Sequence, residues 1–96
     1  MKSLAEIKNS LTHRKTQFFE KYPIKSIAIF GSYARNEQNE DSDVDILVEF
    51  TDNVGIKFID LADEFESYLG LKVDLVSRNG IKARYFETIK SDLVYV

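Results

Sequence analysis

The chain has 96 residues, of which 44% are hydrophobic, and this length allows one compact domain, residues 1–96, with one modest core. It contains no cysteine, which excludes disulfides, thiolate metal sites and thiol catalysis, and no stretch approaches the roughly 20 apolar residues of a membrane span, so we expect a cytoplasmic protein without a membrane partner. The formal net charge of −3 argues against a protein that grips nucleic acid through its phosphates alone, and no direct nucleic-acid partner is expected.

Helical and strand patterns alternate from the N-terminus onwards. Residues 3–21 have the apolar period of one amphipathic helix. Its start is predicted at Ser3, because Ser3 and Glu6 have the spacing of a capping box. Ile24–Phe30 is short and rich in β-branched residues, which is typical of a strand, and residues 33–35 indicate the opening turn of a short helix. The remaining elements are expected to be a polar loop at 36–41, the strongest strand at 43–50, a helix at 55–69 capped by Gly70, a strand at 72–76, a turn at 79–80, a helix at 81–90 and a short strand at 93–96.

The summed order of elements predicts an α/β fold in which a small mixed sheet of three to four strands packs with helices. The aromatic residues are interpreted as core, some of them left exposed as a partner surface, and the lone histidine, His13, receives no role. The strand order is not readable from the sequence. The aromatic residues concerned are Phe18, Phe19, Tyr22, Tyr85 and Phe86.

Two aspartates at the start of the strongest strand are the first chemical signal. Asp43 and Asp45 are two residues apart, so their side chains point to the same face, with α-carbons about 6.6 to 6.8 Å apart. Carboxylates at that spacing can converge on Mg²⁺ or Mn²⁺. If the pair is partly buried, its repulsion is roughly 3 kcal/mol, whereas in water it falls below about 1 kcal/mol. An acidic strand end that simply faces solvent is therefore an equally open interpretation.

A glycine-serine turn and a further aspartate add to this signal. Gly31 and Ser32 stand where a strand gives way to a helix, where backbone amides and a hydroxyl can hold a phosphate, although such a pair is more often only a turn. Asp74 interrupts an otherwise apolar strand and must be paired, metal-bound or at an exposed edge. Asp41 and Glu49 are interpreted as surface charges.

Taken together, the ordered segments GSYAR at 31–35, SDVDILVEF at 42–50 and KVDLV at 72–76, with ten residues between Ser32 and Asp43, form a recognisable set. This set closely resembles the DNA polymerase β-like nucleotidyltransferase superfamily, and within it the minimal nucleotidyltransferase (MNT) domains. The resemblance spans nearly the whole chain, and it implies the nucleotidyltransferase fold.

The resemblance also implies a role for each motif residue. Asp43 and Asp45 would bind both of two Mg²⁺ ions, with Mn²⁺ as an alternative metal. Asp74 would complete the site of the catalytic ion and help to deprotonate the acceptor hydroxyl. Gly31 and Ser32 would hold the terminal phosphates of the nucleotide.

Three neighbouring residues belong to the same motif. Arg35 matches the motif arginine and is expected to contact phosphate or orient the aspartates, with a plain surface charge as the alternative. Tyr33 is expected either to stack on a base or to pack in the core. Asn36 stands where many MNT sequences have glycine, and since asparagine tolerates left-handed backbone angles, the turn is expected to survive.

The activity that this resemblance implies is transfer of AMP from ATP to a protein hydroxyl, a tyrosine of a HEPN-domain toxin. The chain would then be a protein adenylyltransferase and the antitoxin of a type VII-like HEPN/MNT pair. Two alternatives stay open: a non-catalytic antitoxin that masks the HEPN partner by binding, and nucleotidyl transfer to a small molecule such as an aminoglycoside. The oligomeric state is not readable from the sequence.

Overall fold

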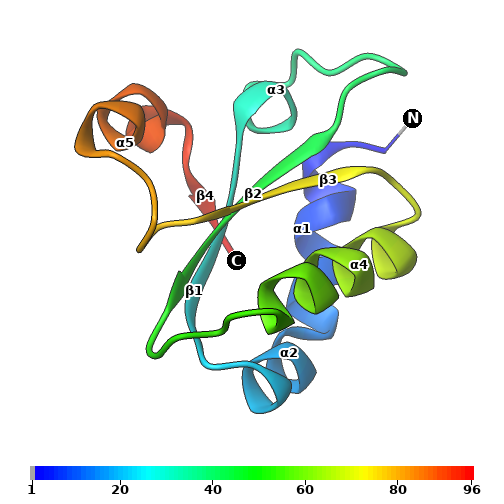
Figure 1. The fold of residues 1–96 in the computed structure, drawn as a ribbon. Helices are drawn as coiled ribbons and strands as arrows, with labels where there is room; N and C mark the ends of the chain where they lie inside the picture. Colours follow the sequence, from blue (N-terminus) through cyan, green and yellow to red (C-terminus); the bar gives the residue numbers. More distant parts are fainter. Residues whose placement is uncertain (1) are drawn as a thin grey trace.

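The computed structural model describes residues 2–96, in which helices surround a four-stranded mixed sheet (Figure 1). The strand order is β3-β2-β1-β4; β2 and β3 are parallel, and the other neighbours are antiparallel. The predicted α/β fold class is therefore confirmed. The elements are α1 (Leu4–His13), α2 (Lys15–Lys21), β1 (Ile24–Phe30), α3 (Gly31–Ala34), β2 (Val44–Phe50), α4 (Lys57–Leu69), β3 (Val73–Ser77), α5 (Ala83–Ile89), the 3₁₀ helix η1 (Lys90–Asp92) and β4 (Val94–Tyr95).

The two faces of the sheet carry different helices. On β2, the side chains of Ile46 and Val48 are buried in the main core, which also contains buried residues of α1, α2 and α4. Leu47 lies on the opposite face, where it packs in a smaller cluster with Phe30 and with Ile89 of α5. Figure 1 shows the same division, with α5 standing apart from the other long helices. Alternation along β2 thus assigns its odd-numbered residues, Asp45 included, to the face that α5 covers.

The N-terminal helix differs from its prediction. The capping box of Ser3 and Glu6 is present, but the chain leaves helical geometry at Arg14, with φ −109° and ψ 11°, so the single helix predicted over 3–21 is two helices. The Arg14 guanidinium stacks over the Tyr68 ring, 4.4 Å from its centroid, and Phe18 packs edge-on against Phe65 at 4.8 Å. The break therefore lies at a residue that contacts α4, and Phe18 of α2 contacts the same helix.

Element ends elsewhere shift by a few residues. Helix α3 begins at Gly31, two residues before the predicted start, because the chain turns into helix directly after β1. Helix α5 begins at Ala83 rather than at residue 81 and gives way to η1 after Ile89. Gly70 ends α4 with φ 69°, as predicted. Within residues 2–96, no helix combines the length and apolar character that a membrane crossing requires.

An ion pair between α2 and α4 gives a testable contribution to stability. Lys21 Nζ lies 2.7 Å from Glu64 Oε1, and the Tyr22 hydroxyl donates to the same carboxylate. Both contacts, Lys21 first, lower the pKa of Glu64. Glu64→Gln should therefore reduce the free energy of unfolding by roughly 1 kcal/mol near neutral pH, a figure discounted because the pair is partly exposed.

Acid should erase this difference. Because the folded-state pKa lies below the unfolded value, the stabilisation exists above the ordinary glutamate pKa and is lost as the pH falls through the folded value. Urea unfolding of both chains near neutral pH and at about pH 3 measures this convergence. Glu87→Gln is the matched control, because Glu87 pairs only with exposed Lys90 one helical turn away, and should change little. A Glu64→Gln deficit that persists in acid would contradict the ionic origin.

Candidate active site

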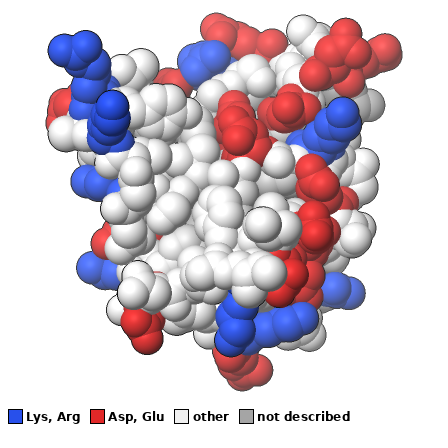
Figure 2. Space-filling view, in the orientation of Figure 1, with Lys and Arg blue, Asp and Glu red and all other residues white. Residues whose placement is uncertain are grey.

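Two of the predicted aspartates stand side by side on neighbouring strands. Asp45 of β2 pairs directly with Asp74 of β3 in the parallel register, so both side chains lie on the face covered by α5. Their carboxyl groups are within hydrogen-bonding reach of each other. Figure 2 shows acidic groups gathered at the upper end of the molecule and over α4. The meeting of the two strands' aspartates, predicted from motif spacing, is thus present in the structure.

The surroundings of Asp45 disfavour its negative charge. Burial, followed by the charge and hydrogen bond of Asp74 and the charge of Asp43, raises the pKa of Asp45 to about 6, and the positive charge of Arg35 opposes the shift. Like charges in a half-buried setting repel one another, so the carboxyl keeps its proton to a higher pH than a free aspartate does. A cation at this point would reverse that balance, which is the electrostatic signature of a site suited to a positive ligand.

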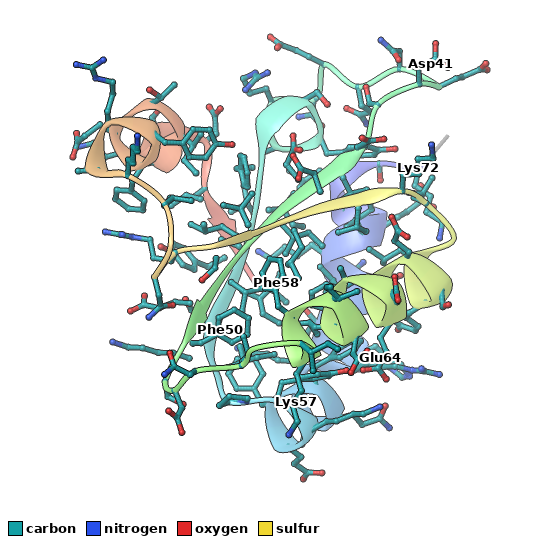
Figure 3. The ribbon with its side chains drawn as sticks, viewed as in Figure 1. Asp41, Phe50, Lys57, Phe58, Glu64 and Lys72 are labelled. Atoms are coloured by element: carbon teal, nitrogen blue, oxygen red, sulfur yellow. The ribbon has the colours of Figure 1, made fainter. Side chains whose placement is uncertain are left out.

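Asp43 lies just before β2 and is exposed. It lines a hollow of about 380 Å³ together with Asp41 and with Lys72, which precedes β3. The backbone extends the β2–β3 ladder here, because Val44 N–H donates to the Lys72 carbonyl at 2.9 Å. Figure 3 shows that Asp41 and Lys72 lie at the same end of the molecule. Lys72 therefore places a positive charge at the rim of the acidic group, two residues before Asp74.

Gly31 is held against Asp45. It follows Phe30, the β1 residue that pairs with Asp45, and its backbone adopts φ +74°, in the left-handed region. A Cβ atom at this position would lie 2.0 Å from Asp45 Oδ2. Glycine is therefore required both by the backbone angle and by the space that the carboxylate occupies. Ser32, the next residue, is half-buried, and its carbonyl accepts the Glu37 N–H at 2.8 Å, which closes the turn after α3.

The motif arginine is engaged by carboxylates from outside the triad. Arg35 Nε lies 2.8 Å from Glu37 Oε1, and its Nη1 lies 2.6 Å from Asp92 Oδ2. These contacts tie the end of α3 to η1, while the charge of Arg35 still reaches Asp45. The orienting role and the phosphate contact both stay predictions, with a plain surface charge as the alternative. Asn36 adopts φ 58°, so the expectation that the turn survives without glycine is confirmed.

The structure decides between the interpretations left open for two tyrosines. Tyr33 is only 2% exposed and packs in the main core, so the packed interpretation is correct and base stacking is not. Tyr85 belongs to the aromatic group interpreted as core with some members left exposed, and it is an exposed member: it is 42% exposed, and partial burial followed by the charges of Asp74 and Asp45 raises its pKa. Helix α5 packs instead through Ile89, which is buried, and Phe86, which is half-buried. Lys72 received no role from sequence, although its spacing from Asp74 could have indicated a shared face.

The donor set suits a hard divalent cation. Three carboxylates, from Asp43, Asp45 and Asp74, interact electrostatically at this end of the sheet, and carboxylate oxygen is the ligand that Mg²⁺ and Mn²⁺ prefer. Across residues 2–96, however, no group of three or more acidic, histidine or cysteine side chains is already arranged to hold a metal ion. The three carboxylates are therefore near one another but are not arranged as the ligands of one ion. Their assignment as metal ligands stays a prediction.

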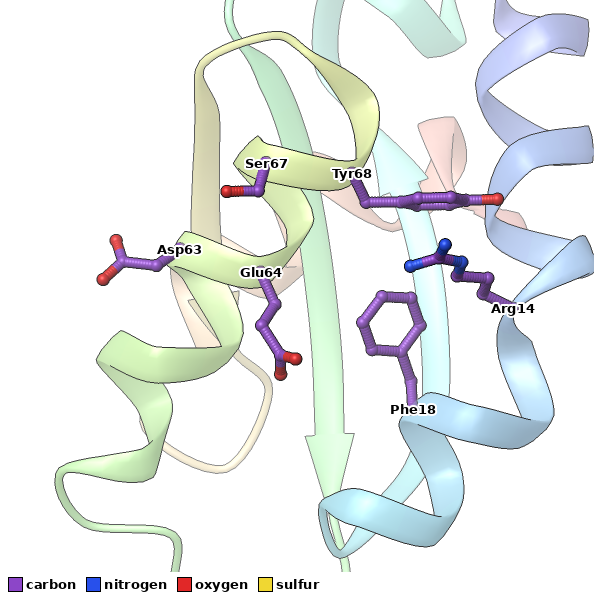
Figure 4. A pocket seen from close by; sticks show the side chains of 6 residues that line it. All are labelled: Arg14, Phe18, Asp63, Glu64, Ser67 and Tyr68. Carbon is purple, nitrogen blue, oxygen red and sulfur yellow. The ribbon is translucent and has the colours of Figure 1, made fainter.

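A hollow of similar size lies elsewhere on the molecule. It measures about 400 Å³ and opens between α2 and α4, with Arg14 stacked on Tyr68 above Phe18 (Figure 4). Phe18 belongs to the main core, on the opposite side of the sheet from Asp45. None of the predicted site residues lines it, so size alone does not mark the chemical site of this protein.

Comparison with known proteins supports the chemistry of the motif. Residues 14–96 match the family model described as a nucleotidyltransferase domain. A protein of Methanocaldococcus jannaschii that carries the provisional name protein adenylyltransferase is 53% identical over 98 residues, covering 100% of both chains. The protein adenylyltransferase MntA of Thermococcus cleftensis is 43% identical over 97 residues, covering 100% of this chain and 98% of its own.

Solved structures agree on the fold. A minimal nucleotidyltransferase structure superposes with a TM-score of 0.74 at 28% identity, covering 92% of this chain and 93% of its own. A chain from the complex of the tri-AMPylated Shewanella oneidensis HEPN toxin with an MNT antitoxin gives a TM-score of 0.71 at 22% identity. That match covers 93% of this chain and 70% of the solved one, and at this identity it bears on the fold alone.

Proposed function

Because this chain belongs to the family of nucleotidyltransferase domains, we propose that it transfers AMP from ATP to a tyrosine hydroxyl of a HEPN-domain toxin and so acts as the antitoxin of a toxin-antitoxin pair. The observation that carries the proposal is the register of two strands, which sets Asp45 beside Asp74 with Gly31 against the same carboxylate. An acidic surface patch without a function would not require glycine next to one of its carboxylates.

The proposed roles follow from position. Asp43, Asp45 and Asp74 would hold two Mg²⁺ ions, which when bound would neutralise phosphate charge and align the reacting oxygens. Asp74, whose side chain is exposed, would accept the proton of the incoming hydroxyl. Gly31 and Ser32 would bind the terminal phosphates of ATP.

The proposed partner is inferred from the name of a relative and from a complex in which a chain of the same fold was solved. One relative is named a protein adenylyltransferase, and a chain of the same fold is solved with an AMPylated HEPN toxin. An acceptor that is a separate protein accounts for both points.

Metal removal tests the proposal directly. The chain is incubated with ATP, Mg²⁺ and the HEPN-domain protein encoded beside its gene, and intact mass spectrometry reports added AMP. Chelation of the metal with EDTA should abolish the adduct, and Mn²⁺ should restore it, because carboxylates alone would repel the phosphates.

The outcomes separate the alternatives. Neutralisation of the HEPN protein without any adduct would replace the proposal with a binding antitoxin. No effect on that protein, together with AMP transfer to a small hydroxylated molecule, would replace it with a small-molecule transferase. AMP transfer that EDTA does not inhibit would support the transferase activity but contradict the proposed metal site.

A further inference from the structure

Helix α5 carries a tyrosine at the border of the carboxylate site, and the proposed function gives this residue no task. The helix packs on the sheet face that bears the carboxylates, because Ile89 is buried against Leu47, and Leu47 follows Asp45 by two residues. Tyr85 lies one helical turn before Ile89, on the same side of the helix. The fold therefore sets a phenol along the edge of the face where Asp45 and Asp74 meet.

The Tyr85 hydroxyl is not used to stabilise the fold. Its side chain is 42% exposed, and no hydrogen bond of this hydroxyl is present among residues 2–96. Partial burial, and then the negative charges of Asp74 and Asp45, raise its pKa, and the second cause places the phenol near both carboxylates. A free hydroxyl beside two carboxylates has the chemistry of an acceptor.

The position of Tyr85 is fixed from both ends of its helix. Before the helix, the Arg78 guanidinium lies 3.8 Å from the centroid of the Phe86 ring. After it, Asp92 binds Arg35 at 2.6 Å. A nucleophile held in this way beside a reaction centre reacts as though at a very high local concentration.

We propose that Tyr85 is itself an AMP acceptor, so that the chain adenylylates its own tyrosine when no partner competes; this rests on the proposed function. The Tyr85 phenolic oxygen would form a bond to the α-phosphorus of ATP. The bond from that phosphorus to the bridging oxygen would break, pyrophosphate would leave, and the phenolic proton would pass to Asp74. The attached AMP would then cover the carboxylates and stop further transfer.

The other four tyrosines differ in ways that make the proposal specific. Tyr22 and Tyr68 donate their hydroxyls to Glu64 and to the Ser10 carbonyl, and Tyr33 is only 2% exposed. The remaining one is Tyr95, which is 55% exposed but lies on β4, the edge of the sheet opposite to β3. Tyr95 is therefore a matched control, more accessible than Tyr85 but remote from Asp74.

The test uses the whole chain without a partner. Purified protein is incubated with ATP and Mg²⁺, and intact mass spectrometry with peptide sequencing locates any AMP. We expect one AMP on Tyr85, its loss in Tyr85→Phe by at least about tenfold, and an unchanged adduct in Tyr95→Phe. The first-order rate constant should not change when the protein is diluted, because the acceptor belongs to the same molecule. Thermal unfolding of both variants checks that they are folded.

Several results would overturn the inference. AMP on Tyr95 or on any residue other than Tyr85, a rate constant that rises with protein concentration, or an unmodified chain would each do so. Failure of the proposed function is distinguished by the wild-type chain with its HEPN partner. If the partner gains AMP and the chain does not, only the self-transfer is wrong; if neither gains AMP, the transferase proposal fails as well.

Discussion

Replacement of Asp45 by asparagine is expected to slow AMP transfer to the HEPN partner by roughly a thousandfold or more. Asp45 lies at the centre of the site: Asp74 lies within hydrogen-bonding reach, Asp43 adds its charge, and Gly31 leaves it room. Asparagine keeps the size and removes the charge that would hold the metal ions. Single-turnover mass spectrometry at saturating ATP measures the rate.

Glu49→Gln is the matched control for this variant. Glu49 lies on the same strand, four residues from Asp45 and on the same face, but it pairs with Lys25 at 3.6 Å on the exposed surface. Its replacement removes the same charge from β2 and should leave the rate within about twofold. Equal losses in the two variants would mean that net charge, not metal binding, accounts for the effect. An Asp45→Asn chain that transfers AMP at the wild-type rate would refute the catalytic role outright.

The folded elements were readable from sequence where one local pattern decided them. Richness in β-branched residues predicted the strand Ile24–Phe30, and alternation predicted a strand over 43–50, where the structure has Val44–Phe50. Gly70 predicted the end of α4. The break at Arg14 was not readable, because its stacking partner Tyr68 lies in another helix. Strand order was hidden for the same reason, since pairing of β3 with β2 and of β4 with β1 is fixed by tertiary packing.

The candidate site shows the same limit. The two-residue spacing predicted that Asp43 and Asp45 share a face, and the order of the motifs predicted that Asp74 joins them. Only the register of the parallel strands, however, sets Asp74 opposite Asp45. Arg35 could be assigned a charge but not its partner, since Asp92 is 57 residues away. Local rules give the identity of the chemical groups, whereas the pairing of distant segments decides which groups face one another.

Gly31→Ala is expected to reduce the transfer rate by about a hundredfold while the protein stays folded. The new methyl group would lie 2.0 Å from Asp45 Oδ2, and the easiest relief is rotation of that carboxylate away from Asp74. A displaced carboxylate would no longer hold the proposed metal ions in the required geometry. The backbone strain of alanine at φ +74° adds a stability loss of roughly 1 to 2 kcal/mol.

Gly70→Ala separates strain from displacement. Gly70 has a similar φ of +69°, but an added Cβ would meet no atom within 4 Å, so this variant carries the backbone strain without touching the site. Both variants should therefore lower the melting temperature by a similar amount, about 4 to 8 °C for each 1 kcal/mol. Only Gly31→Ala should lose transfer when rates are compared well below both melting temperatures. If Gly70→Ala lost as much activity as Gly31→Ala, the contact between Gly31 and Asp45 would have no special part in catalysis, since general destabilisation would explain both.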